Sequence, residues 1–222
     1  MICYFCHEAL MEEVDIANLF KRQGPLCHKC RGELSRWRAG RRCDFCHRLM
    51  EEQETKCLDC LFLSGRFQPP NSITCLLDYH GTAKMLFHRY KFTGDCALAE
   101  VLAMFLDRRF GEYEVIIPIP ISRTRMKERG YNQTTMVLDA KGLRYSDFLE
   151  TDERQRQSGL GKVARAQGEN PFHLNCRREG LADKRILVID DIYTTGMTVH
   201  QALEKLYTFS PASIDVLTFS KA

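Results

Sequence analysis

The sequence predicts an α/β protein with a mainly parallel sheet and a small Cys-rich module at its N-terminus. Three observations lead to this prediction. Four consecutive apolar residues, Ile186 to Ile189, are typical of a strand that is buried on both faces of a parallel sheet. Segments of strand and helix character alternate from residue 72 onward. Four C-x-x-C pairs, in contrast, all lie within the first 60 residues.

Length and charge narrow the classes of protein to consider. With 222 residues, the chain has room for one domain of ordinary size and a small appendage. Its 32 basic and 29 acidic residues give a net charge of +3, too small by itself to indicate nucleic-acid binding. The sequence has no apolar run of 18 residues and no secretory leader pattern, so we expect a soluble, cytoplasmic protein.

The C-x-x-C pairs indicate metal binding. Eight of the 11 cysteines belong to them, and in a reducing compartment this pattern is more typical of metal ligands than of disulfides. Two pairs complete a closed, structural site in which four thiolates bind one Zn²⁺. The predicted zinc ligands are Cys3, Cys6, Cys27, Cys30, Cys43, Cys46, Cys57 and Cys60.

An internal repeat suggests how these pairs combine. Cys-Tyr-Phe-Cys-His at residues 3–7 recurs as Cys-Asp-Phe-Cys-His at 43–47, and a later C-x-x-C pair follows each copy. The repeat favours sequential pairing, with the first four cysteines on one zinc and the last four on another. A cross-braced arrangement and a single zinc both remain open. Haem attachment and thioredoxin-like redox chemistry fit less well, since no export signal is present and one pair would suffice for redox work.

The polar, turn-rich segment 64–71 predicts a domain boundary, which divides the chain into a Cys-rich module (1–66) and a larger domain (67–222). Apolar patterns in the larger domain predict strands and helices in alternation. Besides the strand at 186–189, the expected strands are 72–79, 115–120 and 213–219, and the expected helices are 83–90, 96–110 and one that starts after Asn132. The polar, glycine-containing segment 151–172 suggests a mobile cover.

Two acids and a polar turn follow the strand at 186–189. Because ligands bind at the carboxyl ends of parallel strands, Asp190 and Asp191 are expected at the mouth of a crevice. Thr194, Thr195 and Gly196 then form a tight turn whose amides converge before a helix that starts at Thr198. This combination suits a phosphorylated sugar, whose hydroxyls the acids would hold directly or through Mg²⁺. An ordinary polar turn without a ligand is the alternative.

A basic loop follows the strand at 115–120. Arg123, Arg125, Lys127 and Arg129 cluster there, and guanidinium groups bind phosphate in bidentate fashion, so the loop suits a pyrophosphate. A solvated basic turn is the alternative. A second basic stretch, residues 21–48, has nine Lys and Arg against two acids and is a candidate surface for an anionic polymer.

Several of these motifs resemble known families. The run from Ile186 to Val199 resembles the motif with which type I phosphoribosyltransferases bind 5-phosphoribosyl 1-pyrophosphate (PRPP). Over nearly the whole chain, the combined motifs resemble the ComF family of competence proteins (ComFC type). They are the four Cys pairs, Tyr90-Lys91-Phe92, Pro118-Ile119-Pro120, Arg129-Gly130-Tyr131-Asn132-Gln133, the segment 157–172 and Asp190-Asp191.

The resemblance implies a factor for the uptake of single-stranded DNA in natural transformation. It implies a helicase-like ATPase partner (ComFA type) and a peripheral association with the membrane uptake machinery through partners. It further implies a PRPP site with Mg²⁺. Asp190 and Asp191 would hold the ribose and magnesium and are the candidate catalytic residues, Thr194, Thr195, Gly196, Met197 and Thr198 would bind the 5-phosphate, and Arg123, Arg129 and Lys91 would meet the pyrophosphate.

The same resemblance leaves the activity open. Thr194 stands where many purine phosphoribosyltransferases have an acid, and no acceptor pocket is recognisable, so the sequence favours ligand binding over transfer. One alternative is a true phosphoribosyltransferase of nucleotide salvage or biosynthesis, and another is an adaptor that binds no PRPP. The zinc module would contact single-stranded DNA, a protein partner or both.

Overall fold

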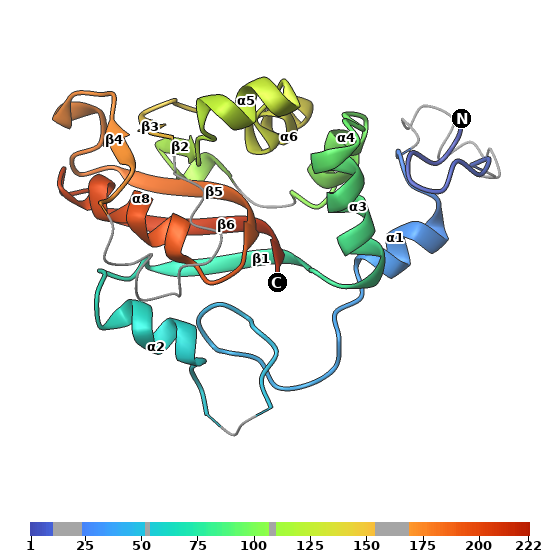
Figure 1. The fold of residues 1–222 in the computed structure, drawn as a ribbon, viewed down its shortest axis with the longest axis horizontal. Helices are drawn as coiled ribbons and strands as arrows, with labels where there is room; N and C mark the ends of the chain where they lie inside the picture. The colour runs from blue at the N-terminus through green and yellow to red at the C-terminus, as the bar shows by residue number, and fades with distance from the viewer. Residues whose placement is uncertain (11–23, 52–53, 107–109, 154–168) are drawn as a thin grey trace.

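A four-stranded parallel sheet forms the centre of the protein (Figure 1). The computed structural model describes residues 1–10, 24–51, 54–106, 110–153 and 169–222. The strand order is β1 (Ser72–Asp78), β6 (Ser213–Lys221), β5 (Arg185–Tyr193), β2 (Val115–Pro118). The two inner strands are rich in β-branched and other apolar residues, as burial on both faces requires. The predicted α/β class with a mainly parallel sheet is confirmed.

Helices cover both faces of this sheet. Because successive residues of a strand point to opposite faces, Leu187 and Ile189 of β5 enter one hydrophobic cluster, and Ile186 and Val188 enter the other. The first face is covered by α3 (Gly81–Phe92), α4 (Leu98–Ala103) and α6 (Gln133–Lys141), and the second by α8 (Met197–Tyr207). The remaining elements of this domain are α5 (Arg123–Arg129), the 3-10 turns Phe110–Glu112 and Arg178–Gly180, and the antiparallel pair β3 (Leu149–Thr151) and β4 (Phe172–Leu174).

The structure differs from the sequence expectation in several elements. The helix predicted at 96–110 is shorter and ends at Ala103. The basic segment after β2 was predicted as a loop but forms helix α5, since Ser122 caps its first turn and Gly130 ends it in the left-handed conformation. The strand with the two acids continues past them to Tyr193, because its parallel neighbour β6 extends to Lys221. Most of the predicted cover, residues 154–168, lies outside the described residues.

The Cys-rich segment wraps around the sheet. Its two helices, α1 (His28–Leu34) and α2 (Leu58–Ser64), each begin directly after the first cysteine of a C-x-x-C pair. In Figure 1, α1 lies beside α3 and α2 lies below the sheet. Cys3 and Cys30 belong to the hydrophobic cluster on the α3 face, whereas Cys43 and Cys60 belong to the cluster on the α8 face. The first half of the segment therefore packs against α3, which covers one face of the sheet, and the second half joins the cluster on the other face.

A buried carboxylate holds the connection between these halves. Asp78, at the end of β1, accepts hydrogen bonds from the Arg38 side chain at 2.8 Å and from Arg42 at 3.0 Å. The Arg38 backbone amide adds a further bond of 2.9 Å. The Asp78 side chain is only 1% exposed, so this anchor is shielded from water. Within the described residues, no helix combines the length and apolar character needed to cross a bilayer.

Candidate functional site

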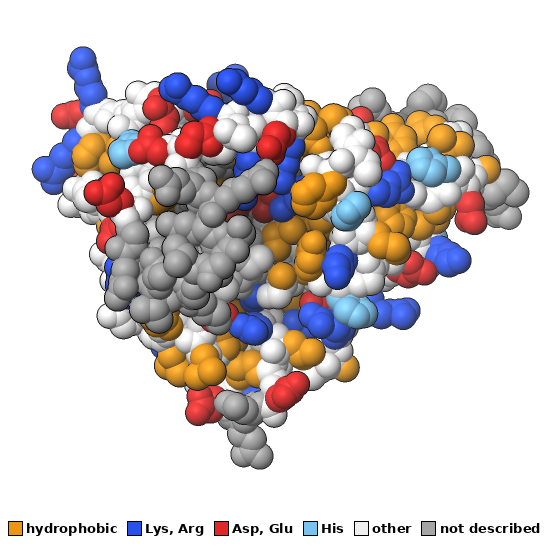
Figure 2. Space-filling view, in the orientation of Figure 1, with side chains coloured by type: hydrophobic (Ala, Val, Ile, Leu, Met, Phe, Trp, Pro, Cys, Tyr) orange, Lys and Arg blue, Asp and Glu red, His pale blue; other side chains and the backbone are white. Residues whose placement is uncertain are grey.

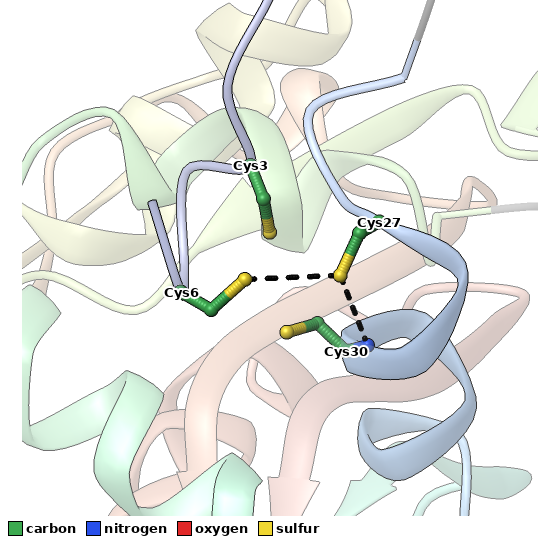
Figure 3. A group of neighbouring side chains, drawn as sticks. All are labelled: Cys3, Cys6, Cys27 and Cys30. Carbon is green, nitrogen blue, oxygen red and sulfur yellow. Dashed lines mark hydrogen bonds between the residues drawn. The ribbon is translucent and has the colours of Figure 1, made fainter. Parts of the chain in front are cut away.

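The structure groups the eight cysteines of the C-x-x-C pairs as the repeat predicts. The first cysteine group is Cys3, Cys6, Cys27 and Cys30, and the second cysteine group is Cys43, Cys46, Cys57 and Cys60. Figure 3 shows the first group, in which the four sulfur atoms point toward one another from a tight N-terminal turn and from the start of α1. The repeat is visible in the backbone too, because the amides of His7 and His47 each donate to the carbonyl of the group's first cysteine, at 2.9 Å.

The sulfur geometry fits a tetrahedral metal ion. Zn–S bonds of about 2.3 Å place the sulfurs of a tetrahedral site about 3.8 Å apart. The observed distances are 3.8 Å between Cys6 and Cys27 and 3.7 Å between Cys46 and Cys57. All four ligand atoms of each group lie within 4.8 Å of one another. Both groups can therefore hold a metal ion, and their all-sulfur ligands favour zinc among the common structural ions.

Crowding of the second cysteine group supports the same conclusion. A hydrogen bond with Cys60 lowers the pKa of the Cys46 thiol to about 5, while the same bond and burial raise the pKa of Cys60. Four buried thiols this close cannot all ionise without a cation among them. A bound divalent metal removes that conflict, since it keeps all four sulfurs as thiolates.

The two acids on β5 lie beside a lysine from α3. The carboxylate of Asp191 is 2.6 Å from the Lys91 ammonium, and both side chains are largely buried. The backbone amide of Asp191 donates to the side chain of Asp190 at 2.8 Å, which fixes the two acids relative to each other. The structure thus brings together Lys91 and Asp191, two residues that the sequence predicted for one site, and bonds the side chain of Asp190 to the backbone of Asp191.

The Arg-Gly-Tyr-Asn-Gln run holds the end of α3 against the end of α5. The Tyr131 hydroxyl donates to the carbonyl of Tyr90, and the Tyr90 hydroxyl donates to the carbonyl of Gln133 at 2.8 Å. The Asn132 side chain caps α6 and also donates to the Ile119 carbonyl at 3.0 Å, which ties the run to the end of β2. These bonds keep the last turn of α3, with Lys91, next to Arg129.

Arg129 completes this basic side of the site. Burial and the nearby Arg125 lower the pKa of its guanidinium, whereas the charge of Asp191 raises it, so Arg129 and Asp191 are electrostatic neighbours. Its guanidinium also lies 5.5 Å from the centre of the Phe92 ring. Arg123 begins α5, six residues earlier, and therefore lies about 9 Å farther along the helix axis. Its predicted role stays a prediction.

The loop after β5 has the backbone that an anion site needs. We call residues 194–198 the anion loop. Gly196 has φ +84° and forms the N-cap of α8, so the first amides of that helix face the loop. A Cβ at this position would collide with the hydroxyl of Tyr193, so the position requires glycine. The loop and the two acids thus lie at the same end of β5, as the sequence predicted.

Fewer basic side chains of the stretch 21–48 are available to bind an anion than its composition suggested. Arg38 and Arg42 are bound to Asp78, and Arg48 is bound to Asp59. Among the described residues of this stretch, 24–48, four further basic side chains are exposed: Lys29, Arg31, Arg36 and Arg41. A second basic surface lies over α5, where Lys and Arg side chains stand out at the top of the molecule (Figure 2).

Sequence reasoning missed three residues that lie next to the anion loop: Tyr193, His200 and Lys221. The Lys221 ammonium donates to the carbonyls of Tyr193 and Thr194, and His200 bonds to the carbonyl of Gly196. The sequence could have indicated Lys221. Parallel strands end at the same edge of a sheet, and β6 is the neighbour of β5, so the last residue of β6 lies beside the end of β5. The sequence interpretation ended that strand at residue 219, two residues too early.

Among known proteins, relatives match nearly the whole length of this chain. The chain is 33% identical over 227 residues to competence protein ComFC of Streptococcus pneumoniae (strain ATCC BAA-255 / R6), covering 99% of each chain. It is 28% identical over 213 residues to competence protein ComFC of Bacillus subtilis (strain 168), covering 91% of this chain and 87% of the relative. No family model matches the chain.

A solved structure also matches part of the chain. The allosteric regulatory enzyme of purine biosynthesis matches with 17% identity and a TM-score of 0.34, over 55% of this chain and 24% of the other. An overlap this partial supports no argument about function.

Proposed function

Because the chain belongs to the ComFC family of competence proteins, we propose that it is a DNA-uptake factor of natural transformation whose α/β domain binds PRPP with Mg²⁺. The observation that carries the PRPP part is one cluster at the carboxyl end of β5. There Asp190, Asp191 and the anion loop follow one another, and Lys91 contacts Asp191 at 2.6 Å. Carboxylates for a sugar and amides for its phosphate suit a phosphorylated ribose.

Each part of this cluster has a distinct task in the proposed site. The amides of the anion loop bind the 5-phosphate, because the N-terminus of α8 carries partial positive charge. The oxygens of Asp190 and Asp191 suit ribose hydroxyls and Mg²⁺, which neutralises pyrophosphate charge when bound. Lys91 and Arg129 face the pyrophosphate from α3 and α5. Lys91 must then exchange Asp191 for a phosphate oxygen.

We expect PRPP with Mg²⁺ to raise the melting temperature of the wild-type protein. At a ligand concentration of about 100 Kd the stabilisation is about 2.7 kcal/mol, which corresponds to roughly 5–10 °C for a chain of this size. The double variant D190N/D191N should lose this shift, because it lacks both carboxylates that hold the ribose and the metal. The substitution D147N, at an exposed residue just before β3, should keep it. Thermal melts with PRPP, with and without Mg²⁺, measure both effects.

The same experiment separates the alternatives. An unchanged ligand shift in D190N/D191N contradicts the proposed site, and no shift in the wild type favours an adaptor that binds no PRPP. Release of pyrophosphate from PRPP on addition of nucleobases or amines would instead establish a true phosphoribosyltransferase.

We also propose that both cysteine groups hold Zn²⁺, that residues 1–66 form the zinc-binding part and that residues 67–222 form the PRPP-binding part. In this proposal the protein works in the cytoplasm, contacts single-stranded DNA and a helicase-like ATPase of the ComFA type, and reaches the membrane uptake machinery through partners. Two exposed basic surfaces support a contact with an anionic strand: residues 29–41 around α1, and α5.

We expect single-stranded DNA to bind with an affinity that falls steeply with salt, because basic side chains displace counterions from phosphates. R31A/R36A tests the surface around α1, and R125A/K127A tests α5. The pair that contacts DNA should weaken binding and reduce the salt slope by roughly one to two. Anisotropy of a labelled oligothymidine at several salt concentrations measures this. Binding that neither pair changes contradicts the DNA contact.

A further inference from the structure

Two buried side chains, those of Lys221 and His200, bond to carbonyls of the anion loop and of the residue before it. Lys221 donates to the carbonyl of Tyr193 at 3.1 Å and to that of Thr194 at 2.9 Å. The carbonyl of Gly196 accepts from the backbone amide of His200 at 3.0 Å and lies 3.1 Å from the Nδ1 atom of its ring. All three carbonyls belong to the loop or to the residue before it.

This arrangement sets the direction of the loop amides. In a trans peptide the N–H points away from the carbonyl of the same unit. When Lys221 holds the Tyr193 and Thr194 carbonyls, the amides of Thr194 and Thr195 face the other side of the chain. An anion needs those amides, and it would be repelled by the carbonyls. Lys221 therefore acts on bound phosphate indirectly, through the peptide units that it fixes.

A buried ammonium needs negative charge nearby. The Lys221 residue is 1% exposed, and burial lowers the pKa of its amine, whereas the thiols of Cys46 and Cys75 raise it. Asp78, its register partner on β1, is bound by Arg38 and Arg42 instead. A divalent metal with four thiolates has a net charge of about −2. The ammonium also donates to the backbone oxygen of Ala222, and Cys46 of the second cysteine group contributes negative charge to its surroundings.

Packing connects the same cysteine group to the loop by a second route. Phe67, which follows α2, contacts the His200 ring at a centroid distance of 5.9 Å, and His200 in turn faces the Tyr193 ring at 6.5 Å. Cys60, Tyr193 and His200 also line one small cavity. The first cysteine group, in contrast, packs on the α3 face of the sheet.

We infer that Lys221 is a positioning residue for bound phosphate and that the metal of the second cysteine group holds it in place. The filled metal site supplies the charge that keeps the ammonium buried, and the ammonium turns the loop carbonyls away from the anion. Metal in the second group therefore controls affinity for the 5-phosphate, whereas the first group borders α3, where Arg89 donates to the carbonyl of Phe5 and Lys91 faces the pyrophosphate. This inference rests on the proposed PRPP site.

The test compares two substitutions of Lys221 in the full-length, zinc-loaded protein. We expect K221M to weaken binding of ribose 5-phosphate and of PRPP with Mg²⁺ by at least about tenfold, because the carbonyls are no longer held. Its melting temperature without ligand should fall by only a few degrees, since the loss of the bonds to the carbonyls is partly offset by removal of a buried charge. K221R should restore affinity to within about threefold, as it keeps the charge and donors. Calorimetric titration gives the affinities.

Two controls separate positioning from general effects. K205M removes a charge elsewhere, on α8, and should leave affinity nearly unchanged, which excludes a long-range charge effect. C57A and C27A each disable one cysteine group, and only C57A should weaken binding of ribose 5-phosphate, which has no pyrophosphate, when both are measured well below their melting temperatures.

The outcomes are distinct. If the wild type binds neither ligand, the proposed PRPP site is wrong and the inference fails with it. If the wild type binds and K221M binds equally well, the site stands and the role of Lys221 is refuted. If C27A weakens binding of ribose 5-phosphate as much as C57A does, the assigned role of the second metal is refuted.

Discussion

Replacing Cys57 with Ala is expected to reduce bound zinc from two ions to one per chain and to lower the melting temperature by roughly 10–20 °C. All four members of the second cysteine group are buried, and they belong to the hydrophobic cluster on the α8 face. Loss of a ligand therefore disturbs the core as well as the metal. We expect a cost of about 3–6 kcal/mol, less than the ~10–16 kcal/mol of isolated zinc-finger peptides, because the sheet retains its own core.

C96A is the matched control, since Cys96 is exposed and belongs to neither group. It should retain both metals and melt like the wild type. C27A should also lose one metal but cost less, because Cys6 and Cys27 are only partly buried. Elemental analysis together with thermal melts measures these effects. Two zinc ions in C57A would show that the predicted ligand set is wrong.

Replacing Asp78 with Asn should destabilise the protein by about 2–4 kcal/mol at neutral pH. Burial alone would raise the pKa of this carboxyl, but hydrogen bonds from Arg38 and Arg42 outweigh burial and hold the pKa well below its usual range. This loss of stability is at the low end of the range for a broken buried ion pair, because Arg38 is 40% exposed and water can solvate its guanidinium.

The effect of D78N should depend on pH with a definite sign. The folded-state pKa of Asp78 is depressed, so its contribution is fully present above the unfolded pKa of about 3.9. It is lost as the pH falls from there through the folded-state pKa. The gap in unfolding free energy between wild type and D78N should therefore narrow below about pH 4. E114Q, which alters an exposed ion pair, should change the unfolding free energy little at any of these pH values. Urea denaturation at several pH values measures this, and a gap that stays constant into acid refutes the ion-pair explanation.

Features encoded locally could be predicted from the sequence. The four apolar residues at 186–189 are sufficient for a buried parallel strand, and the Cys-x-x-Cys repeat predicted the grouping of the cysteines. Asn132 was predicted as a helix cap because its side chain acts on amides two residues away. In each case the determining interaction lies within a few residues or within a repeated motif.

Features that depend on tertiary structure could not be predicted in the same way. Helix α5 has no apolar periodicity, and only its caps, Ser122 and Gly130, signal it. The bond between Asp78 and Arg38 joins residues 40 positions apart, and nothing in the local sequence of either residue indicates it. Lys221 is buried because neighbouring strands end together, which becomes apparent only when the strand order is known.

The second half of the Cys-rich segment also protects the sheet against association with other chains. β1 is an outer strand, and such strands present unpaired backbone groups that can recruit a strand from another molecule. The ring of His47 lies 3.1 Å from the carbonyl oxygen of Ile73 on β1, and the carbonyl of Cys46 faces the thiol of Cys75 on the same strand. The segment that carries the second cysteine group thus also shields part of an outer strand, so that the residues able to hold a metal also limit pairing of β1 with other chains.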